Sequence, residues 1–198
     1  PEVLLISPPD DAALQALLDE ATAAITPADA DADEPLDVAD AARTIATLVA
    51  GRLGGAVPYD DYEHFDAAVE VRLAKKTAKS DVVPLGALKK GGARHRATLF
   101  KALADRLGVP CTLKMGACVR GAHAHHAWNL VVVPKAADAH AWVVVDLLHD
   151  VGALLPDGSN EARRYKRVDE FAFASLGSTR AAYTVPPTPA LPAAARAA

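Results

Sequence analysis

The sequence contains few of the features that mark secreted, membrane-spanning or nucleic-acid-binding proteins. Only two cysteines occur in 198 residues, Cys111 and Cys118, so no disulfide framework is possible and a reducing compartment is expected. No apolar run approaches the roughly 20 residues that span a bilayer, and the first residues lack the basic start and apolar stretch of a signal peptide. A formal net charge of -4 offers no basic field to nucleic acid or to an anionic membrane.

Large side chains are also scarce. Aromatic residues make up 5% of the chain, and 44 of its 198 residues are alanines, although the hydrophobic fraction is 51%. The remaining apolar side chains still suffice for one core at this length. The composition therefore predicts a soluble intracellular domain of mixed helices and strands, and it does not indicate a function.

The first 60 residues carry helical periodicity. Asp10 and Asp11 are placed to cap a helix whose leucines fall on one face. A second helix is predicted from about Asp37, with an end at Gly54 and Gly55. We interpret residues 1–60 as a helical N-terminal layer of the same domain as the rest.

Residues 61–175 contain the denser pattern and are interpreted as the core of the domain. The strongest helix covers residues 93–107 and is followed by the stop signals Gly108 and Pro110. Strand-like runs, the last two rich in valine, predict three strands, at 111–115, 127–133 and 141–147. Residues 68–73 fit a short strand and a helix about equally well, and 168–174 fit a short helix. Residues 176–198 form a Pro/Ala-rich tail, either a linker or a segment that lies along a partner.

One arrangement of residues could carry chemistry. A Gly-Gly turn opens the helix at position 93, His-Ala-Trp-Asn follows at 126–129, and a strand ends at Asp146. A thiol enzyme needs a thiolate stabilised by a helix N-terminus, an imidazole that accepts its proton and a carboxylate that orients the imidazole. A helix start followed by two adjacent strands can bring one residue of each kind together.

This order resembles the papain-like, transglutaminase-like superfamily, in which a Cys at a helix start precedes His-Ala-Trp-Asn and an Asp at a strand end. More narrowly, Arg94-His95-Arg96-Ala97 and the residues up to Pro110-Cys111 resemble the domain that precedes the kinase in plant Raf-like kinases of ethylene and disease-resistance signalling. The same domain ends the armadillo-repeat-containing protein 3 family, which the chain resembles over a longer stretch, roughly residues 10–175. Val83-Pro84-Leu85-Gly86 and Val145-Asp146-Leu147 contribute to that longer match.

The resemblance implies an α+β domain of transglutaminase-like (papain-like) architecture, with a helical N-terminal layer and a central helix packed on a small antiparallel sheet. The superfamily's histidine falls on His126 and its carboxylate on Asp146, but its nucleophile falls on Ala93. Cys111 does not replace it, because it follows the far end of the helix, about 22 Å along the axis. Cys118 lies seven residues further along the chain from the helix and does not replace the nucleophile either. The resemblance therefore implies a degenerate triad, a pseudoenzyme and no cofactor.

The neighbouring polar residues allow simpler interpretations. His126 and Asp146 are expected to form a hydrogen-bonded structural pair, and Trp128 is expected in the core. Asn129 either orients His126 or caps a strand edge. His123 and His125 share one face of a strand, but further ligands for zinc are missing, so no metal site is predicted.

Basic residues gather beside the start of the central helix. They could accept phosphate or an acidic partner, although a solvated basic face fits them as well. The predicted binding residues are Lys89, Lys90, Arg94 and Arg96, to which Lys75, Lys76 and Lys79 add.

Taken with the resemblance, these features favour a non-catalytic module for contact between proteins. The resemblance implies that the full chain carries armadillo repeats and belongs to a scaffold in motile cilia or the sperm flagellum. The expected partners are then proteins of a ciliary or cytoskeletal assembly in the cytoplasm or axoneme, without nucleic acid or membrane insertion. Two alternatives remain open: an active cysteine hydrolase or acyl transferase with a displaced thiol, Cys118 before Cys111, and a ligand- or peptide-binding remnant of the cleft between residue 93 and His126.

Overall fold

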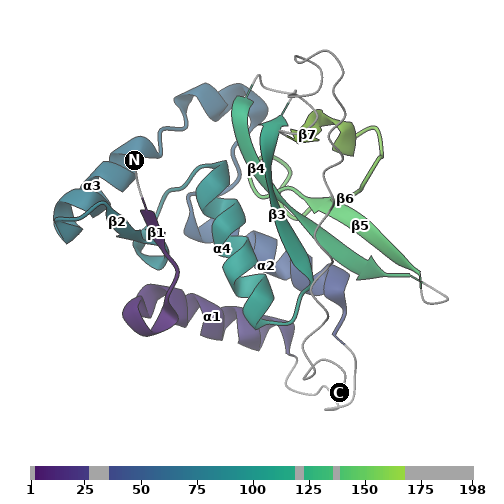
Figure 1. The fold of residues 1–198 in the computed structure, drawn as a ribbon, viewed down its shortest axis with the longest axis horizontal. Coiled ribbons are helices and arrows are strands. Elements are labelled where there is room, and N and C mark those ends of the chain that lie inside the picture. Colours follow the sequence, from purple (N-terminus) through teal and green to yellow (C-terminus); the bar gives the residue numbers. More distant parts are fainter. Residues whose placement is uncertain (1–2, 27–35, 119–122, 136–138, 168–198) are drawn as a thin grey trace, which may run out of the picture.

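A computed structural model describes residues 3–26, 36–118, 123–135 and 139–167 of the chain. Its centre is a five-stranded antiparallel sheet in the order β6-β5-β4-β3-β7, with helices on one side (Figure 1). The strands are β3 (Cys111–Cys118), β4 (His123–Pro134), β5 (His140–Val145), β6 (Leu154–Pro156) and β7 (Tyr165–Arg167). The three strands predicted at 111–115, 127–133 and 141–147 are confirmed, with ends that differ by a few residues.

In the described part of the chain, four α-helices come before the strands of this sheet: α1 (Ala12–Ile25), α2 (Val38–Arg52), α3 (Ala68–Ala78) and α4 (Ala93–Arg106). The predicted cap of the first helix is confirmed, because the Asp11 side chain accepts a hydrogen bond from the Leu14 N–H. Asp37, the predicted start of the second helix, caps α2. Residues 68–73 are helical, so the second of the two interpretations of that segment is correct. Among the described residues, no helix is both long and apolar enough to cross a membrane.

A second, two-stranded sheet was not predicted. β1 (Val3–Leu5) pairs in parallel with β2 (Val82–Pro84), and a short 3-10 helix, η3 (Leu85–Ala87), follows β2. The Gly86 N–H donates to Asp11 Oδ2 at 2.7 Å. A Cβ at Gly86 would lie 2.3 Å from the Leu14 nitrogen, so only glycine fits against the start of α1.

The two faces of the large sheet belong to different cores. Odd-numbered residues of β4 and β5, such as Val131 and Val143, pack with α1, α2 and α4 in the main core. Even-numbered residues, such as Trp128 and Val144, pack on the opposite face in a second core. Trp128 is 2% exposed, in agreement with its predicted place in a core.

Asn129 ties the sheet to the central helix. It is fully buried, and its Nδ2 donates to the Ala97 carbonyl of α4 at 3.2 Å. This role differs from both roles that the sequence suggested for Asn129. Residues of the helical layer expected at 1–60 and of the region expected at 61–175 pack in one hydrophobic core. Three segments lie outside the described residues: the predicted helix at 168–174, the tail from 176 onwards and most of the acidic residues 26–36.

Candidate functional site

Ala93 is the first residue of α4, directly after the N-cap Gly92. It is 5% exposed and belongs to a small apolar cluster with Val57 and Leu148. The helix start that would stabilise a thiolate is therefore present. At that start stands a methyl group packed among apolar neighbours.

Asp146 follows the last residue of β5 and is 1% exposed. Its Oδ1 accepts hydrogen bonds from the N–H groups of Leu148 at 2.8 Å and His149 at 3.0 Å. Its Oδ2 accepts from the Tyr165 hydroxyl at 2.6 Å and lies 3.8 Å from an Arg164 Nη2. Burial by itself raises the pKa of Asp146, but the hydrogen bonds from Tyr165, Leu148 and His149 outweigh burial, so the pKa lies below its ordinary value. The carboxylate is ionised at neutral pH.

Aromatic and basic side chains enclose this carboxylate. The Tyr59 ring stacks on the His149 ring at a centroid distance of 3.9 Å. The Arg164 guanidinium lies over the rings of Tyr59, at 5.7 Å, and Tyr165, at 5.3 Å. We refer to these five residues, Tyr59, Asp146, His149, Arg164 and Tyr165, as the Asp146 cluster.

His126 lies beside the Asp146 cluster. It is 3% exposed, and its ring centroid is 5.7 Å from that of Tyr165 and 6.1 Å from that of His149. Ala93 reaches the same region through Leu148, which belongs to its apolar cluster and directly precedes His149. The loop after β5 thus begins with Asp146, packs on Ala93 through Leu148 and lies beside His126 through His149. The hydrogen bonds of Asp146 described above come from other donors, and its expected hydrogen bond with His126 stays a prediction.

Burial sets the protonation states of Tyr165 and His149. Burial raises the pKa of Tyr165, and the neighbouring Asp146 charge raises it further, so the phenol stays protonated. Burial lowers the pKa of His149, against a smaller opposite effect from the Val57 carbonyl, which accepts from His149 Nδ1 at 2.8 Å. Both groups are thus neutral near pH 7.

Neither cysteine lies at a helix N-terminus. Burial raises the pKa of Cys111 to about 12, so its thiolate is rare at neutral pH. Cys118 is 1% exposed and packs in the second core with Trp128 and Tyr165. It thus shares a sheet face with His126, but it is sealed from solvent.

One of the four predicted basic binding residues is placed differently from the prediction. Arg96 is fully buried, and its guanidinium donates to the carbonyls of Leu53 at 2.7 Å, Gly91 at 2.8 Å and Leu147 at 2.9 Å. It cannot contribute to a binding surface, because its donors join three segments of the core. Lys89 and Arg94 are exposed, whereas Lys90 is half-buried with its Nζ 4.7 Å from the Phe65 ring centroid.

Four members of the Asp146 cluster were missed from the sequence: His149, three residues after Asp146, and three residues from other segments. Tyr59 comes from the 3-10 helix η2 (Tyr59–His64), Arg164 ends the 3-10 helix η4 (Ala162–Arg164), and Tyr165 begins β7. No local motif marks them, because they are brought together only by the tertiary fold. The side chains of His123 and His125 lie outside the described residues. Among the described side chains, no group of three or more His, Cys, Asp or Glu is arranged to hold a metal ion.

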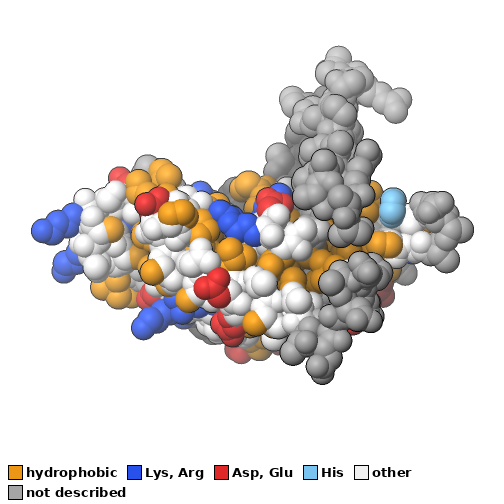
Figure 2. Space-filling view, turned by 90° about the horizontal axis from the view of Figure 1, so that it is seen from below, with side chains coloured by type: hydrophobic (Ala, Val, Ile, Leu, Met, Phe, Trp, Pro, Cys, Tyr) orange, Lys and Arg blue, Asp and Glu red, His pale blue; other side chains and the backbone are white. Residues whose placement is uncertain are grey.

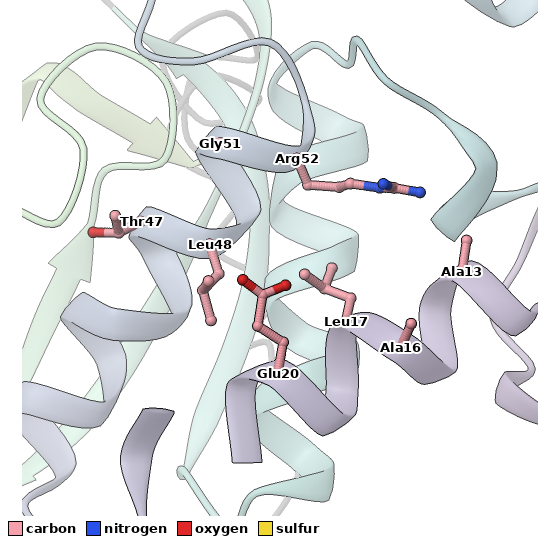
Figure 3. A pocket seen from close by; sticks show the side chains of 8 residues that line it. All are labelled: Ala13, Ala16, Leu17, Glu20, Thr47, Leu48, Gly51 and Arg52. Carbon is pink, nitrogen blue, oxygen red and sulfur yellow. The ribbon is translucent and has the colours of Figure 1, made fainter. Parts of the chain in front are cut away.

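A groove of about 450 Å³ lies between α1 and α2 and shares no residue with the Asp146 cluster (Figure 3). The groove is open where α1 and α2 carry the small residues Ala13, Ala16 and Gly51, and the side chains of Leu17 and Leu48 line it. The carboxylate of Glu20 points across the groove toward α2 in Figure 3. Arg52 also lines it, but its guanidinium is engaged with the Gly86 carbonyl.

Comparison with known proteins agrees with this geometry. The family model described as EDR1/CTR1/ARMC3, peptidase-like, matches residues 1–155, a range that contains all three triad positions. The chain is 36% identical to human armadillo repeat-containing protein 3 over 130 residues, which are 62% of this chain and 14% of that protein. Two Arabidopsis thaliana proteins are 39% identical: probable serine/threonine-protein kinase SIS8 over 114 residues (58% of this chain, 11% of that protein) and serine/threonine-protein kinase CTR1 over 72 residues (36% and 9%).

The chain thus spans at most 14% of the length of each of these relatives. The described helices and the antiparallel sheet are consistent with the predicted α+β, papain-like fold. Since the family model covers more than half of its residues, the chain belongs to the EDR1/CTR1/ARMC3 peptidase-like family.

Proposed function

We propose that this domain is a non-catalytic, peptidase-like module whose role is contact with other proteins. The observation that carries the proposal is Ala93 at the start of α4, where the superfamily pattern has its nucleophile. A methyl group cannot attack a carbonyl, so no covalent intermediate forms at that helix start. The fold is kept, and the group that would perform the chemistry is absent.

The polar residues of the site support a structural role. Both Asp146 oxygens accept hydrogen bonds within the protein, and His126 is 3% exposed. A catalytic imidazole must reach the substrate and the nucleophile within hydrogen-bond distance. A substrate could reach His126 only if the side chains around it moved.

The larger protein is a further part of the proposal. The human relative is named for armadillo repeats. We extend this to the present protein: the domain is attached to armadillo repeats and acts within a scaffold of the motile cilium. Imaging of the tagged full-length protein in ciliated cells tests this part, and uniform cytoplasmic signal without ciliary enrichment would contradict it.

An active cysteine hydrolase or acyl transferase is the alternative from another class. The one observation in favour of this alternative is that Cys118 shares a sheet face with His126. The burial of the Cys118 thiol argues against the alternative. Because a thiolate is disfavoured in apolar surroundings, Cys118 is expected to be inert.

Thiol labelling tests the non-catalytic proposal. The native chain, at pH 7.5 with iodoacetamide, should label no faster than an unactivated cysteine. Ala93→Cys should add at most slow labelling, because position 93 is buried. Ala68→Cys, at the exposed first residue of α3, is the matched control and should label faster, since it presents a thiol at a helix N-terminus in solvent. Peptidase or transamidase turnover by the native chain that disappears in Cys118→Ala would show that the domain is an enzyme.

A further inference from the structure

The outer side of α3 is an amphipathic surface that the rest of the described protein leaves uncovered. Val71 of α3 packs in the main core, and Ala74 packs against it. Val69 and Leu73 lie about 200° around the helix from Val71 at the usual 100° per residue. They are 47% and 55% exposed, so two large apolar side chains one turn apart point away from the core.

Positive charge borders these two side chains. Arg72 and Lys76 lie on the same side of α3, at three and seven residues from Val69, and Lys79 caps the helix C-terminus. Figure 2 shows lysine and arginine side chains beside hydrophobic ones at the end of the molecule that α3 occupies in Figure 1. We call Val69, Arg72, Leu73, Lys76 and Lys79 the outer α3 surface.

Two acidic side chains close to α3 are already engaged, and exposed Asp66 accepts from the Ala68 N–H at the helix start. Asp81 Oδ1 pairs with Lys75 Nζ at 2.5 Å, and Glu70 Oε1 accepts from the Lys89 N–H at 3.0 Å. By contrast, Arg72, Lys76 and Lys79 form no ion pair with another described residue. Lys89 is exposed and adds a further positive charge beside Glu70.

Lys79 adds a positive charge at the C-terminal end of α3. Its φ of 49° places it in the left-handed region at the C-cap of α3, where its N–H bonds back to the last turn. Glycine is the usual residue there, because a side chain makes this conformation less favourable. A lysine at this position keeps a cation at the edge of the surface despite the strain.

We propose that the outer α3 surface binds an acidic amphipathic helix of a partner protein. Such a helix would place two apolar side chains, one turn apart, against Val69 and Leu73, and its Asp or Glu residues would face Arg72, Lys76 and Lys79. A protein fits better than an anionic membrane, because two apolar side chains are too few for the broad apolar face of an interfacial helix. The contact is small, so the binding is weak and reversible on its own. This inference rests on the proposed function only in assuming that the domain binds a partner.

The test uses the full chain and a fluorescent designed helical peptide with leucines at i and i+4 flanked by glutamates. Fluorescence anisotropy should show saturable binding. The double variant Arg72→Glu/Lys76→Glu should weaken this binding at least about tenfold, because opposite charges become like charges. Leu73→Ser should weaken it about fivefold through lost apolar contact. Lys135→Glu, an exposed charge change in the β4–β5 turn, is the matched control and should leave binding unchanged. Equal melting temperatures would show that all variants are folded.

Two further probes decide the partner class. A peptide with serines in place of the leucines should bind much more weakly, and equal binding would overturn the amphipathic recognition. Peptide affinity that is the same for Arg72→Glu/Lys76→Glu and the native chain would place the site elsewhere. Binding to phosphatidylserine vesicles in the absence of peptide binding would assign the surface to a membrane. None of these variants alters residue 93. The thiol-labelling result for the proposed function and the peptide-binding result for the outer α3 surface can therefore be told apart.

Discussion

At the scale of single residues, the central feature is an ionised carboxylate held almost without solvent. A buried charge is stable only when hydrogen bonds and nearby opposite charge offset its desolvation. Asp146 has two backbone N–H donors, the Tyr165 hydroxyl and the Arg164 guanidinium within 3.8 Å. Through Tyr165, this carboxylate joins the end of β5 to β7.

His149 makes the stability of the domain sensitive to acid. Its neighbours are Tyr59, Arg96, Asp146 and Arg164, and burial keeps its folded-state pKa below the unfolded value near 6.5. The folded protein therefore binds fewer protons than the unfolded chain, so stability is full above about pH 6.5 and is lost as the pH falls through the folded-state pKa.

We predict that the free energy of unfolding falls between pH 7 and pH 5, and that His149→Gln reduces this slope. The uptake of one proton on unfolding changes the free energy of unfolding by up to about 1.4 kcal/mol per pH unit. Urea unfolding at several pH values measures the slope. His140→Gln, which changes an exposed histidine on β5, serves as the control and should behave as the native chain. An unchanged slope in His149→Gln would show that other groups cause the acid sensitivity.

At the scale of secondary-structure elements, two aspartate caps that look alike in the sequence differ in what they hold. Asp37 is exposed and, among the described residues, accepts from its own helix, through the N–H groups of Ala39 and Asp40. Asp11 is 4% exposed and accepts from Leu14 with one oxygen and from Gly86, 75 residues away, with the other. Asp11 therefore fixes α1 to the segment that follows β2.

Asp11→Ala is therefore expected to destabilise the protein more than Asp37→Ala. Loss of an exposed cap costs about 1 kcal/mol. Asp11→Ala loses a cap and also leaves the buried Gly86 N–H without its acceptor, so we expect about 2–4 kcal/mol in total. Chemical denaturation of both variants measures the difference. Equal losses would mean that the contact between Asp11 and Gly86 adds nothing to stability.

At the scale of the whole molecule, Arg96 joins segments from three parts of the chain. Its five N–H donors suit several carbonyls at once, which a lysine cannot reproduce. The three acceptors are at the end of α2, in the turn before α4 and in the loop after β5. The loop after β5 also holds Asp146, so Arg96 positions the candidate site indirectly.

We expect Arg96→Met to lower the free energy of unfolding by about 3–5 kcal/mol, because three carbonyls each lose a donor and the packing changes. Arg96→Lys should recover little of this loss. Arg94→Met, at the exposed neighbouring position, should stay within about 0.5 kcal/mol of the native chain. A calorimetric melt compares the three variants, and similar effects at positions 94 and 96 would contradict the role assigned to Arg96.

The sequence by itself determined most of the long helices and strands, and it showed that an alanine stands at position 93. Aspartates at helix starts, glycines at helix ends and valine-rich runs act on near neighbours, so the starts of α1, α2 and α4 and the three long strands could be predicted. The order of Ala93, His126 and Asp146 was visible for the same reason. Residues 68–73 stayed ambiguous between strand and helix, since a short segment fits both periods.

Only the tertiary structure decided which polar groups meet. Arg96 lies four and seven residues before Phe100 and Leu103, on the buried stripe of α4, but nothing near it in the sequence indicates the carbonyls of Leu53 and Leu147. Tyr59, Arg164 and Tyr165 reach Asp146 from distant segments, and β1 pairs with β2 across almost 80 residues. Local patterns specify helices and strands, whereas the partner of a buried charge depends on how those elements pack, because burial makes every unpaired donor or acceptor costly.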